Sequence, residues 1–596
     1  MEKGQNNHHL NQMKNLSNQQ IFFIQRWLEI LHYRTHGSYS LKFLNTHQAI
    51  KEIYQVSSSY LNKEIKSQRH LEMVIQETSK IIEEDEIFKE KSPAHFSLLQ
   101  NVFKGSLKSN DTKIYAIQFQ AKNTLNHIEG KYLSWLIEGL QPLLISESVE
   151  STDKKELFSL LDKIDYLINL LLSELVGQDW SVERLYSLGV ELKDNLKRNI
   201  DYPWEKFFGV LRQSKEEYIC IFPVDGEVSS ELKRLMIKVG INVKNGDECL
   251  SYYSDYQLRS HITDKRDYIS ISVKAYDTYA GVNLAWSNLM QILNIIGYYG
   301  HELPLIDSKP FILYPDKKHF NRNAGLTNIY KKSLIKAPES MINQMVSLID
   351  DRDKRTSINK IVNVFNYITL SHESNSQESK FLNLWIALEA IVETPVYDGE
   401  IERVKEIVSS IHCENYIYSI LRNFHEDCNR CDVAYIPNQK NDWNFEPYEL
   451  LNILTDRIDH NKTEQFLDKC LNKNILLGYR FHNLNEIFKN GKSVSKVIYN
   501  HQTRVKQHLQ RLYRIRNFIV HAAKTNFNLK LFTKHLDEYV DLTISTINFR
   551  LSDGDDNIPE ALSSIKNSVN AKIEILKNSK HLDRDSYYRL IIDGPI

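Results

Sequence analysis

Glycine and proline are scarce in this chain, which has 20 glycines and 13 prolines in 596 residues. These two residues break regular structure most strongly, so their scarcity favours long uninterrupted elements, above all helices. Hydrophobic residues make up 42% of the chain and charged residues 25%, proportions that exclude a disordered protein. The length predicts three or four domains, on a prior of roughly 150 residues each.

Cysteine and long apolar runs are also lacking. The six cysteines are too few and too scattered for a disulfide framework. The polar start, MEKGQNNHHLNQ, contains no apolar core of a signal peptide. The most apolar stretch, residues 157–176, is interrupted by charges and falls short of the roughly 20 clean residues that a membrane span needs. We therefore expect a cytoplasmic protein with no membrane partner.

The chain has neither an excess of positive charge nor a glycine-rich phosphate loop. Its formal net charge is −1, so any contact with RNA must use a local basic patch. Neither GxGxxG nor GxxxxGK[ST] occurs, and we expect no cofactor. Cys428 and Cys431 form a CxxC, with His412, Cys413 and His425 nearby, but there is no second CxxC. An incidental cluster is therefore favoured over a zinc site, and no metal ligand is assigned.

The pattern of apolar residues predicts a mainly α, multi-domain protein. Apolar residues recur at three- and four-residue steps over 157–175, which indicates one wide face of a helix. Asp179 or Ser181 is placed to cap a following helix. We expect a helical N-terminal domain over 1–202, a helical domain over 341–550, and a C-terminal helix and tail over 551–596.

A segment with a different residue pattern separates the two helical regions. EYICIFPV, YISISVKAY and KPFILYP are short runs rich in β-branched and aromatic residues, bounded by turn residues, and they predict strands. A helical pattern, GVNLAWSNLMQILNIIGYYG, lies between the second and third runs. The sequence therefore predicts a small α/β domain over 203–340.

The sharpest chemical feature is the run Arg516-Asn517-Phe518-Ile519-Val520-His521. RNA cleavage by the 2′-hydroxyl needs a group that moves a proton, a role that suits histidine, and a cation that holds the phosphate, a role that suits arginine. On a helix, Asn517 and His521 lie about 40° apart, whereas Arg516 and His521 lie about 140° apart. Pairing two such helices across a twofold axis would bring both residue types into one cleft, which favours a homodimer.

The surrounding charges favour the same hypothesis. No Asp or Glu occurs from Lys489 to Lys534. The span holds eleven bases, namely Lys489, Lys492, Lys496, Arg504, Lys506, Arg511, Arg514, Arg516, Lys524, Lys530 and Lys534. Such a run is often only a solvated face, but here it predicts the local basic patch that RNA binding requires. Arg511, Arg514 and Lys524 are the RNA-binding candidates beside the motif.

Two stretches resemble a known superfamily. RIRNFIVHAA resembles the Arg-Asn-x-x-x-His signature of the HEPN superfamily, in the style of its Apea-like branch. FLNLWIALEAIVE, over residues 381–393, is similar to that branch's other marker, a helix reading Trp-x-Ala-Leu-Glu. The resemblance covers about residues 355–550, a third of the chain, and implies an all-helical HEPN bundle within 341–550.

The resemblance also implies a function. It implies a dimer with facing motifs, metal-independent cleavage of RNA, and anti-phage defence by abortive infection. Carried over by position, Arg516 would bind or polarise the phosphate, and His521 would transfer a proton or contact the phosphate. Asn517 would orient the site, and Glu389 would be a supporting polar residue. The sequence does not specify the RNA, for which tRNA is one candidate.

Two other functions stay open at this stage. HEPN-like bundles also serve as non-catalytic modules that bind RNA or nucleotides and dimerise. Alternatively, the N-terminal 340 residues do the work of the protein, as a scaffold or as a sensor of a phage-derived trigger. In the first case variants of Arg516 would lose affinity without any cleavage being seen.

Overall fold

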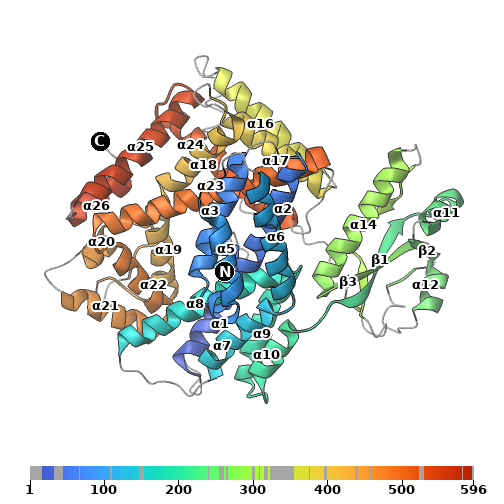
Figure 1. Ribbon diagram of the computed structural model, residues 1–596, viewed down its shortest axis with the longest axis horizontal. Helices are drawn as coiled ribbons and strands as arrows, with labels where there is room; N and C mark the ends of the chain where they lie inside the picture. The colour runs from blue at the N-terminus through green and yellow to red at the C-terminus, as the bar shows by residue number, and fades with distance from the viewer. Residues whose placement is uncertain are drawn as a thin grey trace.

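The computed structural model shows a mainly helical protein with one small antiparallel sheet (Figure 1). It describes residues 16–32, 44–65, 68–105, 107, 111–145, 153–238, 240–253, 261–263, 266–298, 302–307, 309–314, 320–321, 355–374, 376–394, 399–436, 440–455, 460–522, 529–579 and 582–592. The predicted fold class is confirmed: helical regions at both ends of the chain flank an α/β unit.

The N-terminal region is a bundle of helices around one apolar core. Its helices are α1 (Asn18–Leu31), α2 (Thr46–Leu61), α3 (Gln68–Glu84), α4 (Glu86–Lys91), α5 (Pro93–Phe103), α6 (Asp111–Ile128), α7 (Tyr132–Ile145), α8 (Lys154–Gly177), α9 (Val182–Lys197) and α10 (Pro203–Leu211). The predicted helix over 157–175 is α8, and Ser181 caps α9 by accepting a hydrogen bond from the Arg184 amide. Trp204 and Phe208 of α10 lie in the same core, so this region extends to Leu211, beyond the boundary predicted at residue 202.

The middle region is the predicted α/β unit. Its elements are β1 (Glu216–Asp225), α11 (Ser230–Lys238), β2 (Asn242–Asn245), α12 (Gly246–Tyr252), β3 (Asp267–Ala275), α14 (Thr278–Tyr298), β4 (Leu305–Ile306), β5 (Phe311–Leu313) and β6 (Phe320–Asn321). The three strands predicted from sequence are β1, β3 and β5. The strand order is β2-β3-β1-β5-β6, with β4 paired to β1 and all pairs antiparallel. Helix α14 packs its apolar side on the sheet, at the side of the molecule (Figure 1).

The C-terminal region is all-helical but has two cores rather than one. Its helices are α16 (Arg355–Glu373), α17 (Gln377–Ile391), α18 (Glu400–Glu414), α19 (Tyr416–Arg430), α20 (Tyr448–Thr455), α21 (His460–Lys473), α22 (Ile475–Ile487), α23 (Gly491–Ala522), α24 (Leu529–Asp553), α25 (Ile558–Asn578) and α26 (Arg584–Ile592). The first core joins α16, α17, α18 and α24 to the second half of α23. The second core joins helices α19, α20, α21, α22 and α26 to the first half of α23.

The predicted boundaries do not separate independent units. Ile475, Leu476 and Tyr479 of α22 pack into the N-terminal core. Ile558 and Leu562 of α25 belong to the first C-terminal core, so α25 is part of the bundle. No helix in the described part of the chain is long and apolar enough to span a membrane.

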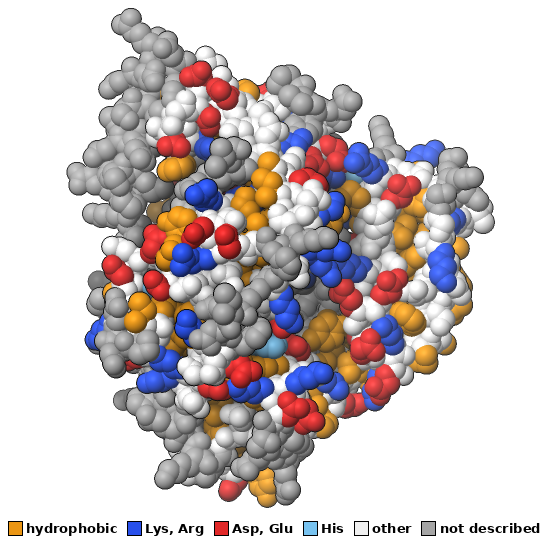
Figure 2. Space-filling model, turned by 90° about the vertical axis from the view of Figure 1, so that its left-hand side faces the viewer, with side chains coloured by type: hydrophobic (Ala, Val, Ile, Leu, Met, Phe, Trp, Pro, Cys, Tyr) orange, Lys and Arg blue, Asp and Glu red, His pale blue; other side chains and the backbone are white. Residues whose placement is uncertain are grey.

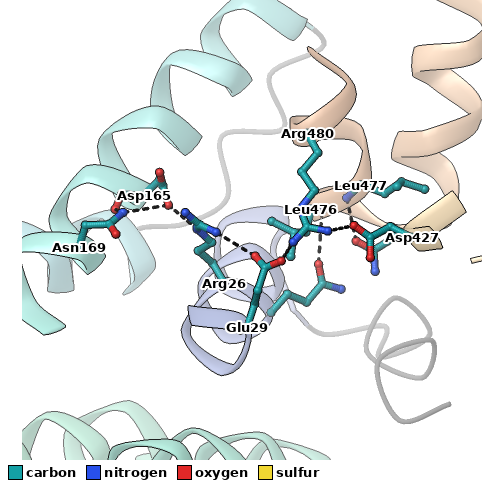
Figure 3. Close-up of polar contacts among 10 residues, drawn as sticks. Arg26, Glu29, Asp165, Asn169, Asp427, Leu476, Leu477 and Arg480 are labelled. Atoms are coloured by element: carbon teal, nitrogen blue, oxygen red, sulfur yellow. Dashed lines mark hydrogen bonds and ion pairs between the residues drawn. The ribbon is translucent and has the colours of Figure 1, made fainter. Parts of the chain in front are cut away.

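Buried charges reinforce the contact between α22 and the N-terminal helices (Figure 3). Arg480 of α22 pairs with Glu29 of α1 and with Asp427 of α19. Arg26 of α1 pairs with Glu29 at 2.9 Å and with Asp165 of α8. Removing one member of such a buried pair leaves an uncompensated charge, so these contacts tie the two regions together strongly.

Candidate functional site

The two motif helices form as their sequences predict. In α17, Phe381, Leu384, Trp385 and Leu388 are buried, and Ser376 caps the helix by accepting a hydrogen bond from the Ser379 amide. In the second half of α23, Val505, Leu509, Leu512 and Ile515 are buried. These spacings place one apolar stripe on each helix, as burial against a common core requires.

The fold brings these two helices together, although their motifs are far apart in sequence. Both stripes belong to the same core, to which α16, α18 and α24 also contribute. The Trp385 ring lies beside the Tyr513 ring, with centroids 5.7 Å apart. Because Trp385 precedes Glu389 by one turn and Tyr513 precedes Arg516 by one turn, this packing sets the two polar residues on neighbouring helices.

Arg516 and Asn517 form one polar group on α23. A guanidinium N–H of Arg516 donates to Asn517 Oδ1 over 3.1 Å. Both side chains are partly buried. Arg516 has no ion pair with an acid among the residues that the structure describes, so much of its donor fork stays open to a ligand anion.

Glu389 lies within the electrostatic reach of this group. Burial raises the pKa of the Glu389 carboxyl above its ordinary value of 4.5. The Trp385 indole N–H, Arg516 and Arg403 each lower that pKa, whereas Glu400 raises it. The Glu389 Oε1 atom is buried and makes no hydrogen bond of normal geometry within the described structure. Burial and the two guanidinium groups therefore act on this carboxyl in opposite directions, and burial has the larger effect.

Arg403 is a member of this site that sequence reasoning missed. It lies in the first turn of α18, and its guanidinium donates to the Thr394 carbonyl over 3.5 Å. No motif marks it, because only the packing of α18 beside the end of α17 places it near Glu389. The described site therefore combines two guanidinium groups with one carboxyl, an arrangement that can bind an anion and hold a proton.

Two sequence-predicted residues cannot be placed in this geometry. His521 lies in the last turn of α23, but its side chain is outside the described residues, as is Lys524. The backbone at His521 is helical, so His521 keeps the predicted separation of about 140° from Arg516 around the axis of α23.

Arg511 and Arg514, which the sequence analysis predicted to bind RNA, are held in ion pairs with acids of the N-terminal helices. Arg511 pairs with Glu52 of α2 at 3.0 Å and with Glu77 of α3 at 2.8 Å, and Arg514 pairs with Glu52. Both arginines are buried. Despite its burial, the two arginines hold the pKa of Glu52 below its ordinary value. Acids from a distant part of the sequence therefore neutralise these bases, and neither presents its charge to solvent.

The predicted basic patch is correspondingly smaller than the sequence indicated. Lys506 pairs with Glu406 of α18 at 2.7 Å, and Lys489 pairs with Glu486. Lys530 donates to Asn283 of α14 over 3.2 Å. On the face shown in Figure 2, positive and negative side chains are interspersed. Among the described residues, the charges that act at the site are those of Arg516 and Arg403, together with the acids Glu389 and Glu400.

The cysteine cluster does not assemble as a metal centre in the described residues. No group of three or more His, Cys, Asp or Glu side chains there has the arrangement of a metal site. Cys413 donates to the Ile498 carbonyl over 3.8 Å, and His425 contacts the Tyr435 hydroxyl at 3.0 Å and the Asp442 carbonyl at 2.7 Å. Cys428 is fully buried among apolar side chains. These contacts give the cysteines and histidines packing roles.

Comparison with known proteins adds no further constraint. No family model, curated protein or solved structure matches the chain. The functional interpretation therefore depends on the two motifs and on the way the fold combines them.

Proposed function

We propose that this protein is a metal-independent endoribonuclease of the HEPN type. The observation that supports it is the shared core of α17 and α23, which puts Glu389 within the field of Arg516 and Asn517. Two motifs that are distant in sequence thus contribute to one polar site. If the Arg-Asn-x-x-x-His pattern were incidental, there would be no reason to expect the second motif to pack beside it.

The reaction proposed for this site uses the RNA 2′-hydroxyl as the nucleophile. Arg516 binds the scissile phosphate and stabilises the charge that develops on it. As the 2′-oxygen bonds to phosphorus and the P–O5′ bond breaks, His521 takes the 2′-hydroxyl proton or gives a proton to the departing 5′-oxygen, since histidine titrates near neutral pH. The products are a 2′,3′-cyclic phosphate and a 5′-hydroxyl. Asn517 holds the Arg516 guanidinium, and Glu389 supports the site as a nearby proton-holding group. The requirement for a 2′-hydroxyl would restrict cleavage to RNA.

The proposed active form is a homodimer. Arg516 and His521 lie about 140° apart around α23, so a second copy would complete the cleft. Ile386, one turn before Glu389, is 38% exposed, and Val520, one turn after Arg516, is 48% exposed. Apolar side chains beside a polar site are typical of a surface that a partner covers.

The proposed biological role is that of a cytoplasmic effector of anti-phage defence by abortive infection. The substrate is a cellular RNA, with tRNA as one candidate. The N-terminal region would sense a phage-derived trigger. Its contacts with α22 and α23 give a physical route from such a sensor to the site.

The test is to incubate purified protein with total cellular RNA in EDTA, with and without extract from phage-infected cells. Arg516→Gln and His521→Ala are expected to lose cleavage by at least about a hundredfold, because each removes a group that acts in the transition state. Arg422→Gln, which removes an exposed charge on α19, is the control and is expected to cleave normally. Binding of RNA without cleavage in any condition would favour the non-catalytic module instead.

A further inference from the structure

We propose that Arg403 of α18 is a second phosphate-binding residue of this site and holds the RNA backbone together with Arg516. The inference rests on the proposed function, since it assigns a further residue to the same substrate. No sequence motif includes Arg403. Its guanidinium group is identified by the hydrogen bonds that it lacks.

Arg403, like Arg516, has one described hydrogen bond and no carboxylate partner within the described structure. Its single described hydrogen bond, to the Thr394 carbonyl, is long at 3.5 Å. Its Nε atom is buried without a hydrogen-bond partner, and no acid in the described structure pairs with it. By contrast, Arg480, Arg511 and Arg550 each pair with at least one carboxylate. Buried donors are normally satisfied, so an open guanidinium indicates a place for an anion.

Other unsatisfied groups lie along the same stretch of α17 and the residues after it. The Trp385 ring is fully buried, and its Nε1 atom has no hydrogen bond of normal geometry. The hydroxyl of Thr394, the residue whose carbonyl Arg403 contacts, is also buried without a partner in the described structure. The Glu389 Oε1 atom is also buried and makes no hydrogen bond of normal geometry in the described structure. The Trp385 indole N–H faces the Glu389 carboxylate and lowers its pKa. The donors left for a polar ligand are therefore Arg403 Nε and the Thr394 hydroxyl.

Helices α18 and α23 share a core, and Lys506 of α23 pairs with Glu406 of α18 at 2.7 Å. Arg403 and Arg516 therefore lie on helices that pack against each other. Both lower the pKa of the Glu389 carboxyl, so both charges act at that point, one from α18 and the other from α23. Arg403 lies in the first turn of α18, where the positive end of the helix dipole adds to the attraction for an anion. The ligand that fits two guanidinium forks is a phosphodiester, whose single negative charge is shared by two non-bridging oxygens that can each accept hydrogen bonds.

The test is equilibrium binding of a fluorescent single-stranded RNA with 2′-O-methyl groups, which the enzyme cannot cleave. Wild type, Arg403→Gln, Arg403→Lys, Arg516→Gln and the control Arg422→Gln are titrated at several salt concentrations. Arg403→Gln is expected to weaken binding about tenfold and to lower the slope of log affinity against log salt by about 0.7, the value for one phosphate contact on a single strand. Arg403→Lys is expected to keep the slope, because it keeps the charge, but to bind more weakly than wild type.

The outcomes separate this inference from the function on which it rests. If Arg516→Gln weakens binding and Arg403→Gln behaves like Arg422→Gln, the role of Arg403 is overturned and the ribonuclease proposal stands. If the wild type does not bind RNA, both proposals fail together. Thermal unfolding checks that each variant is folded. If Arg403→Gln is not folded, affinity of Arg403→Lys equal to that of wild type overturns the inference.

Discussion

Glu389 shows how the surrounding structure sets the protonation state of one side chain. Burial raises its pKa above 4.5, and Arg516 and Arg403 offset part of that rise. A carboxyl with a raised pKa in the folded state contributes stability that is fully present below its unfolded pKa. That contribution is lost as the pH rises through the folded pKa. Glu389 therefore destabilises the fold at neutral pH relative to an uncharged side chain.

Replacing Glu389 with glutamine is expected to remove this pH dependence. The variant should gain stability relative to wild type as the pH rises above the ordinary pKa of glutamate, because it has no charge to bury. Arg516→Gln should have the opposite influence on the carboxyl and raise the pKa of Glu389 further, since Arg516 lowers it in the wild type. Urea unfolding over a range of pH measures the first effect, and carboxyl NMR titration measures the second. A constant difference between wild type and Glu389→Gln at all pH values would contradict the account.

The sequence predicted part of this site and could not have predicted the rest. Arg516, Asn517 and Glu389 carry motifs, and the apolar stripes of their helices predict which faces meet. Arg403 carries no motif, because its role depends on how α18 packs. Arg511 was predicted to bind RNA because charge was counted along the chain, whereas its partners come from α2 and α3.

At the scale of elements, α23 connects the parts of the C-terminal region. Its first half packs Val494 and Ile498 into one core, and its second half packs Leu509 and Leu512 into the other. The periodicity predicted the helix but not its division between two cores. The apolar stripe of one helix does not predict which neighbouring helices cover it. Helices α19, α20, α21 and α22 are inserted in the sequence between α18 and α23.

The contact of α2 with α23 is expected to be strongly stabilising. Glu52→Gln leaves two buried arginines without their shared carboxylate and should lower the free energy of unfolding by about 3–5 kcal/mol. The control is Glu574→Gln, whose partner Lys577 is 59% exposed, and its cost should be at most about 1 kcal/mol. Urea denaturation compares the two. Equal, small losses for both variants would mean that the buried network does not hold the helices together.

In the whole molecule, the N-terminal region and the C-terminal helices pack as one structure. The side chains of α22 lie in its core, and Arg480 and Arg511 find their acids there. We predicted separate domains from composition and from the pattern of apolar residues. Those features indicate helices and strands but not the contacts between them. The α/β unit is attached as well, since Asp277 accepts hydrogen bonds from the Ser181 amide and hydroxyl.

A fragment of residues 341–596 is therefore expected to aggregate when it is produced alone. It would expose the apolar face of α22 and leave buried arginines unpaired. Coexpression with a fragment of residues 1–340 should restore a soluble complex, which gel filtration and circular dichroism would detect. A stable, monomeric and folded C-terminal fragment would show that the interface contributes little.

The central claim is that Arg516 and His521 cleave RNA through its own 2′-hydroxyl. The most direct test is to map the termini of RNA cut in EDTA by wild type and by His521→Ala, in the presence of phage-infected extract. Wild type is expected to leave 2′,3′-cyclic phosphate and 5′-hydroxyl ends, and His521→Ala is expected not to produce them. Ends with a 5′-phosphate, or the same cleavage by His521→Ala, would contradict the central claim.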